Sequence, residues 1–93
     1  MVSKHDEIAR RLAEKYKVEY NEGEGPDVKT PKKIIEVATH DSDIEESKKQ
    51  LRGYQKPCYL AVPTKKIDLA KEAVEGTGIG VMGPTGIIHK KAH

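Results

Sequence analysis

The chain has 93 residues, of which 35% are hydrophobic and 34% are charged, and its formal net charge at pH 7 is +2. The length predicts a single domain over residues 1–93 with a small core, because chains split into several domains only well above this size. The 17 basic and 15 acidic residues alternate without long runs of one sign, which indicates a folded chain, and their balance means that net charge alone does not identify a nucleic-acid binder.

The first half of the chain predicts one helix followed by three strands. Residues 3–17 open with Ser3 as a helix N-cap and carry apolar residues along one stripe, as in an amphipathic helix. Residues 18–21 are expected to form a short strand that stops at a turn-like, glycine-containing segment. Two further strands are expected at residues 27–30 and 32–39, and the second of these is rich in β-branched residues.

The second half of the chain predicts helices that alternate with strands. Residues 40–56 carry apolar residues at helical spacing. Residues 57–63 form a continuous apolar run between two prolines, which is typical of a strand buried on both faces. Cys58 lies in this run and is therefore interpreted as a core residue, not as a nucleophile. A helix at residues 65–78 and two strands, at residues 78–83 and 85–90, complete the chain.

This order of elements predicts an α/β fold in which a mixed sheet is flanked by helices. The single cysteine excludes an internal disulfide and fits a reducing compartment. No apolar run approaches the roughly 20 residues that a membrane-spanning helix needs, and the N-terminus lacks the core of a signal peptide. We therefore expect a cytoplasmic protein that has no membrane partner.

Asp27 and Glu36 are the candidate functional residues. Asp27 begins one predicted strand and Glu36 lies in the next, so antiparallel pairing of the two strands would bring their side chains within several ångströms. Two carboxylates at that distance can share a hard cation such as Mg²⁺, which polarises a phosphate and lowers the pKa of an attacking water. The alternative is that Asp27 is a turn residue and that Glu36 faces solvent from its strand.

Three short stretches occur in a set order: Gly-Pro-Asp-Val at residues 25–28, Ile-Ile-Glu-Val at residues 34–37 and Gln-Leu-Arg-Gly-Tyr at residues 50–54. Together, over residues 5–62, they resemble the PD-(D/E)XK nuclease superfamily, in particular the cores of archaeal Holliday-junction resolvases and RecB-type nucleases. The resemblance implies a restriction endonuclease-like αβββαβ core, here with a C-terminal α-β-β extension.

The resemblance also implies a set of metal ligands. By analogy, Asp27 and Glu36 bind the metal together with the backbone carbonyl of Val37, and an acidic residue of the first helix joins them. Glu7 stands where that residue is expected, with Glu14 as an alternative. The cofactor that this set implies is Mg²⁺ or Mn²⁺.

A second group of residues is implied to contact the substrate. Gln50 and Tyr54 resemble the Gln-x-x-x-Tyr element that lies over the active site in RecB-type nucleases, and a spacing of four residues puts both on one helix face. Gln50 is accordingly counted with the catalytic residues. Tyr54 is expected to contact nucleic acid, together with Lys48, Lys49 and Arg52, whose cationic side chains suit phosphates.

Residue 38 departs from the superfamily's pattern. That pattern places a lysine two residues after Glu36, where this chain has Ala38. Strand alternation puts Glu36 and Ala38 on the same face, so a shift of register does not bring a lysine to this place. Lys29, counted with the catalytic residues, and Lys48 are candidates for a relocated lysine. The alternative is a site that has lost its activity.

The sequence thus predicts a small, divalent-metal-dependent DNA endonuclease, with weak activity because the motif lysine is absent. The expected partners are duplex or branched DNA and a second copy of the chain in a homodimer. The first alternative is a catalytically inactive module of the nuclease fold that binds DNA or has a structural role. The second alternative is a subunit of a larger nuclease complex.

Overall fold

The computed structural model describes residues 3–21 and 26–92. The helices are α1 (Lys4–Lys15), α2 (Asp41–Leu51) and α3 (Ile67–Ala73), and a 3-10 turn, η1 (Thr64–Lys66), precedes α3. The strands are β1 (Val28–Lys29), β2 (Ile34–Val37), β3 (Cys58–Ala61), β4 (Gly80–Met82) and β5 (Ile88–Lys90). They form one five-stranded sheet in the order β1-β2-β3-β4-β5.

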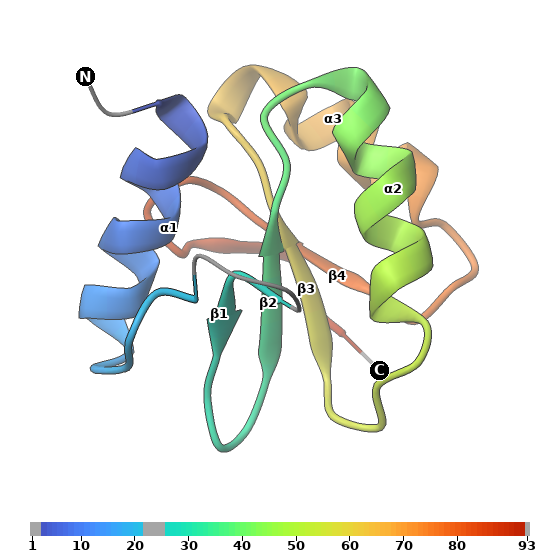
Figure 1. Cartoon of the computed structure of the whole chain (residues 1–93). Coiled ribbons are helices and arrows are strands. Elements are labelled where there is room, and N and C mark those ends of the chain that lie inside the picture. Colours follow the sequence, from blue (N-terminus) through green and yellow to red (C-terminus); the bar gives the residue numbers. More distant parts are fainter. Residues whose placement is uncertain (1–2, 22–25, 93) are drawn as a thin grey trace.

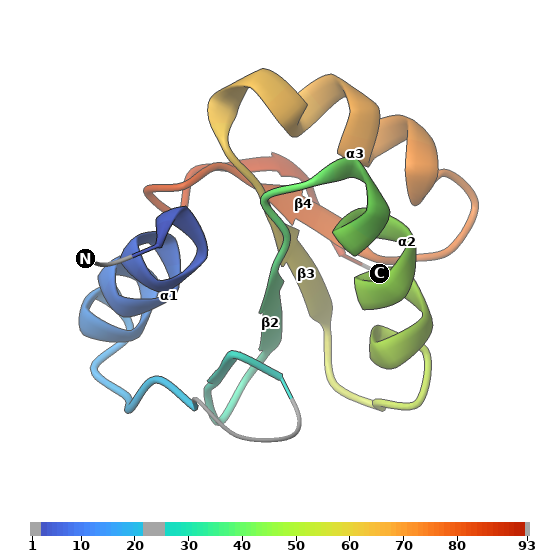
Figure 2. The same cartoon turned by 45° about the horizontal axis from the view of Figure 1, so that its top comes forward.

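The sheet is mixed and lies between two layers of helix. Strands β2, β3 and β4 are parallel, while β1 and β5 pair antiparallel at the two edges. Helix α1 covers one face of the sheet, and α2 and α3 cover the other (Figures 1 and 2). The predicted α/β class, with a mixed sheet flanked by helices, is confirmed. In the described part of the chain, no helix has the length and apolar character needed to cross a membrane.

Helix α1 forms and packs as its sequence predicts. The Ser3 side chain accepts a hydrogen bond from the backbone N–H of Asp6 at 3.1 Å, which satisfies one of the free N–H groups of the first turn. The buried stripe of the helix consists of Ile8, Ala9, Leu12 and Ala13. It packs on the sheet in a cluster that includes Val28, Ile35, Val37, Tyr59 and Met82.

Strand β2 divides its side chains between the two faces of the sheet. Ile35 and Val37 belong to the cluster under α1, whereas Ile34 and Ala38 belong to the cluster under α2 and α3. The alternation of a strand therefore directs Glu36 to the α2 side, the same side as Ala38. This agrees with the face that the sequence predicts for both residues.

The strand predicted at residues 18–21 is reduced to a single bridge. Only Tyr20 pairs, with Val28 in β1. Lys17 adopts a left-handed backbone conformation with φ of 57°, and the N–H of Val18 returns to the carbonyl of Ala13. The chain thus reverses directly after α1, which leaves few residues to extend along β1. The remainder of the predicted turn, residues 22–25, lies outside the described residues.

The third predicted helix is shorter than residues 65–78. Its first residues form the 3-10 turn η1, and α3 ends at Ala73. Gly76 follows with φ of 79°, a left-handed conformation that glycine adopts at low cost after a helix end.

Gly80 packs closely against residues of β3 and β5. A Cβ atom at this position would lie 2.5 Å from Cε1 of Tyr59 and 2.6 Å from the backbone oxygen of Lys90. Because a ladder oxygen cannot move aside freely, Gly80→Ala is expected to lower the free energy of unfolding by about 1–3 kcal/mol. Gly53→Ala is the matched control, since a Cβ there meets nothing within 4 Å. Urea denaturation of both variants measures the difference, and equal stability of the two would contradict the packing.

Candidate functional site

Asp27 and Glu36 meet where β1 and β2 pair. Val28 lies opposite Ile35 in the antiparallel register, and the same register continued by one residue places Asp27 opposite Glu36. Both residues are buried, with 8% of their surface exposed, and their carboxyl groups are hydrogen-bonded to each other. The structure therefore brings together the two carboxylates that the sequence singles out.

Glu36 holds a proton at neutral pH. Burial, the hydrogen bond to Asp27 and the charge of Asp27 raise the pKa of the Glu36 carboxyl from 4.5 to about 9, and burial is the largest of these causes. The neutral Glu36 carboxyl is thus the donor in its hydrogen bond to Asp27. Two carboxylates in contact cannot both ionise without a cation between them, so the pair shares one proton.

The backbone of Val37 turns toward the same pair. Its N–H donates a hydrogen bond to Oδ2 of Asp27 at 2.9 Å. The next N–H, that of Ala38, points the other way, to the carbonyl of Ala61 at the end of β3. Because the N–H and C=O of one strand residue point to the same edge, the carbonyl of Val37 also lies on the β1 side. This is the carbonyl that the resemblance implies as a backbone ligand.

His5 of α1 completes the cluster. Its Nε2 atom lies 3.1 Å from Oδ2 of Asp27, and its Nδ1 atom lies 3.3 Å from the hydroxyl oxygen of Tyr20. That hydroxyl donates to Oδ1 of Asp6 at 2.7 Å, a hydrogen bond that is the main cause of the lowered pKa of Asp6.

These contacts hold the imidazole of His5 between two neighbours. Its Nε2 atom and the Val37 N–H approach the same oxygen of Asp27, at 3.1 Å and 2.9 Å. The Tyr20 hydroxyl, which donates to Asp6, lies against the other ring nitrogen. His5 therefore links α1 to the Asp27 carboxyl group.

The sequence prediction overlooked His5 and chose Glu7. Two residues along an α-helix correspond to a rotation of about 200°, so Glu7 faces away from His5. Glu7 is exposed, pairs with Arg11 at 4.0 Å and lines a separate surface pocket that also includes Glu14. Neither acidic residue reaches the Asp27–Glu36 pair. A signal for His5 was present, since it precedes Ile8, Ala9 and Leu12 at helical spacing on the buried stripe.

An open pocket of about 170 Å³ lies beside Glu36, the member of the pair that contributes to its lining. It is lined by His5, Glu36, Val37, Asp43, Glu46, Ser47 and Gln50. The structure therefore brings Gln50, at the end of α2, to the same pocket as Glu36. Asp43 and Glu46 add acidic groups, and within the described residues no lysine or arginine contributes to the lining. The field in this pocket favours a cation and repels an unaccompanied phosphate.

The candidate relocated lysines lie outside this pocket. Lys29 is exposed on β1, and Lys48 of α2 does not line the pocket. Ala38 is fully buried in the core cluster with Ile44 and Leu60. The position at which the resemblance implies a lysine is thus part of the apolar core.

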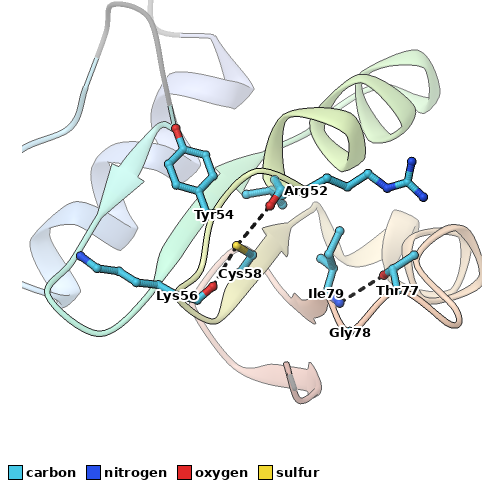
Figure 3. Close-up of a pocket in the computed structure, with 8 residues that line it drawn as sticks. Arg52, Tyr54, Lys56, Cys58, Thr77, Gly78 and Ile79 are labelled. Carbon is cyan, nitrogen blue, oxygen red and sulfur yellow. Dashed lines mark hydrogen bonds between the residues drawn. The ribbon is translucent and has the colours of Figure 1, made fainter.

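Tyr54 does not share a helix face with Gln50, contrary to the prediction. Helix α2 ends at Leu51, and residues 52–56 form turns, with Tyr54 N–H bonded to the carbonyl of Leu51. The flexibility of Gly53 and the following proline favour this early end over a helix to residue 56. Tyr54 is 37% exposed and lines a different pocket with Arg52 and Lys56 (Figure 3). Lys49 is exposed on α2 and lines neither pocket.

Cys58 lies at the inner side of this second pocket (Figure 3). Its thiol contacts the carbonyl oxygens of Leu51 at 3.5 Å and Lys56 at 3.2 Å, and burial raises its pKa. A thiol with a raised pKa is a poor nucleophile. Cys58 is thus a core residue, as the sequence predicts.

The ligand set for a metal ion is small. In residues 3–21 and 26–92, no three His, Cys, Asp or Glu side chains are grouped to hold one ion. The donors that meet at the β1–β2 pairing are the Asp27 and Glu36 carboxyl groups and the carbonyl of Val37. Such an all-oxygen set with few protein ligands matches Mg²⁺, which keeps several of its waters.

The proton on Glu36 predicts a pH-dependent stability. Between pH 4.5 and about 9 the folded chain holds a proton that the unfolded chain has lost, so raising the pH favours unfolding. The free energy of unfolding without metal should fall by up to about 1.4 kcal/mol per pH unit in this window. Glu36→Gln should remove this contribution.

Urea denaturation in a chelator, at several pH values from about 5 to about 8 in this window, measures the slope. The exposed residue Glu45 supplies the control, because Glu45→Gln should keep the wild-type slope. Parallel pH curves for wild type and Glu36→Gln would contradict the shared proton.

Comparison with known proteins adds no assignment. The chain matches no family in a scan of protein families, and searches of curated proteins and of solved structures return no significant match. The case for a function therefore depends on the side chains described above.

Proposed function

We propose that this protein is a divalent-metal-dependent DNA endonuclease with a restriction endonuclease-like core, and that its rate is low. The observation that carries the proposal is the buried, hydrogen-bonded pair of Asp27 and Glu36 with the Val37 backbone beside it. Carboxylates are costly to bury together. Binding of a cation in place of the shared proton would explain why this small sheet holds two carboxyl groups at one point.

The residues of the site fit Mg²⁺ or Mn²⁺. Asp27, Glu36 and the Val37 carbonyl offer oxygen ligands, and the open pocket beside Glu36 and Val37 leaves room for waters and a phosphate. When bound, the cation supplies the positive charge that polarises a phosphate and acidifies an attacking water. The acidic lining requires such a cation before a DNA phosphate can enter.

The neighbouring residues hold this arrangement. His5 contacts Oδ2 of Asp27 at 3.1 Å, and the Val37 N–H contacts the same oxygen at 2.9 Å. These two contacts fix the orientation of the carboxylate, so that its other oxygen remains for a ligand. Gln50 lies across the pocket from the sheet and can donate an amide hydrogen bond to a phosphate oxygen or to water.

A second candidate function is a DNA-binding module without catalysis. The observation in its favour is Ala38, which is packed in the core where the nuclease pattern needs a lysine. A fixed positive charge at a developing oxyanion contributes about 3–4 kcal/mol to a reaction barrier. The pocket lacks this contribution, which supports a slow enzyme and also a chain that binds metal and DNA without cutting.

Carboxylate variants test the nuclease proposal. Wild-type protein with Mn²⁺ is expected to nick supercoiled DNA slowly, and Asp27→Asn and Glu36→Gln should each reduce the single-turnover rate at least about 100-fold. Asp68→Asn is the matched control, because Asp68 is exposed on α3 and lines none of the pockets described above. Gel analysis of nicked DNA at equal protein concentration gives the rates.

Metal binding separates the two candidate functions. If wild-type protein binds Mn²⁺ in calorimetry, Asp27→Asn does not, and no variant nicks DNA, the non-catalytic module is supported. If Asp27→Asn nicks DNA as fast as wild type, the carboxylate pair is not the catalytic centre and the nuclease proposal is wrong.

A further inference from the structure

We propose that a further pocket, lined by Lys4 and Lys65 (the basic pocket), binds a phosphate group of a nucleic-acid strand. This phosphate is the neighbour of the phosphate held in the pocket beside Glu36 (the acidic pocket). The pocket measures about 430 Å³ and is lined by Lys4, Thr39, Pro63, Thr64, Lys65, Lys66 and Pro84. The identity of its ligand as a nucleic-acid strand rests on the function proposed above, whereas its affinity for phosphate does not.

The pocket lies at the carboxyl end of the parallel strands. Thr39 follows β2, Pro63 follows β3 and Pro84 follows β4, while Lys4 opens α1. The start of α1 and the segments that leave β2 and β3 gather at this end of the sheet (Figures 1 and 2). The segments that follow three neighbouring strands therefore line one cavity.

The charge of this pocket is positive and only partly neutralised. Lys66 pairs with Asp41. Within residues 3–21 and 26–92, Lys4 and Lys65 have no carboxylate partner. Two cationic side chains that line one cavity and have no carboxylate partner among the described residues, beside the hydroxyl groups of Thr39 and Thr64, are donors that suit a phosphate.

The basic pocket adjoins the acidic one. Lys4 and His5 are consecutive residues of α1, and one lines each pocket. At the end of β2, Val37 lines the acidic pocket and Thr39 lines the basic one. Two residues of extended chain span only about 6.6 Å. A strand that would place one phosphate near Asp27 and Glu36, in the presence of a cation, can therefore place a neighbouring phosphate between Lys4 and Lys65.

The two pockets have complementary chemistry. The acidic pocket admits a phosphate only together with a cation, whereas the basic pocket admits it directly. Pro63 and Pro84 provide apolar walls in the basic pocket, which suit the deoxyribose between two phosphates. Its volume is within the range of about 300–1,000 Å³ of ligand pockets.

The salt dependence of DNA binding tests this inference. Binding of a fluorescent duplex oligonucleotide is measured in a chelator, so that no cleavage occurs, for wild type and for the double variant Lys4→Gln/Lys65→Gln. Loss of the one phosphate contact that the two lysines share should reduce the slope of log K against log salt by about 0.9. The control is Lys71→Gln/Lys91→Gln, which removes the same charge from exposed positions outside the pocket and should keep the wild-type slope.

A titration with inorganic phosphate locates the site. In wild-type protein, the amide NMR signals of Thr39, Thr64 and Lys65 should shift, and in the double variant they should not. If phosphate shifts these amide signals but the double variant keeps the wild-type salt slope for DNA, the pocket binds a free phosphate compound. That result would contradict the binding of a nucleic-acid strand in the pocket. The proposal that this pocket binds phosphate is wrong if the control loses as much slope as the double variant. It is also wrong if the double variant behaves as wild type in both measurements.

The outcome is independent of the nuclease proposal. If the slope difference is found but the protein neither binds Mn²⁺ nor nicks DNA, the phosphate pocket is supported and the nuclease proposal is wrong. If the protein nicks DNA through Asp27 and Glu36 but the double variant keeps the wild-type slope, the nuclease proposal is supported and the phosphate pocket is wrong.

Discussion

The contact between the Glu36 and Asp27 carboxyl groups is the constraint on which the site depends. Two buried carboxyl groups in contact carry at most one negative charge unless a cation joins them, and the pKa of Glu36, raised to about 9, expresses this. The pair is held from several directions: the β1–β2 register sets the strands opposite each other, the Val37 N–H fixes one oxygen of Asp27, and His5 approaches the same oxygen from α1.

The fold makes this contact possible with few residues. Only two residues of β1 pair with β2, yet they suffice because the longer β2 is fixed on its other edge by β3. The two faces of β2 are packed by different helices, so Glu36 opens toward α2 while its neighbours Ile35 and Val37 anchor the strand under α1. The same parallel strands, at their carboxyl ends, form the walls of the basic pocket. One sheet therefore supports a cation-attracting pocket and a phosphate-attracting pocket side by side.

The sequence predicted those parts of the site that follow from strand periodicity. The approach of Asp27 to Glu36 and the shared face of Glu36 and Ala38 depend on alternation, which short-range rules describe well. His5 was overlooked because an acidic residue, implied by the resemblance, drew the assignment to Glu7 on the other side of α1. Tyr54 was misplaced because the helix pattern was continued through Gly53, where the structure ends α2. The basic pocket was beyond reach of the sequence, since Lys4, Thr39 and Lys65 converge only through the order of the strands.

The most direct test of the account is a titration of the Glu36 side-chain carboxyl by carbon-13 NMR, with and without Mg²⁺. In a chelator, the midpoint should lie near the pKa of about 9 that the buried pair imposes. Saturating Mg²⁺ should move the midpoint down by several units, because the cation and the proton compete for the same oxygens. A midpoint near 4.5 without metal, or one that Mg²⁺ leaves unchanged, would contradict the claim that this pair exchanges a shared proton for a cation.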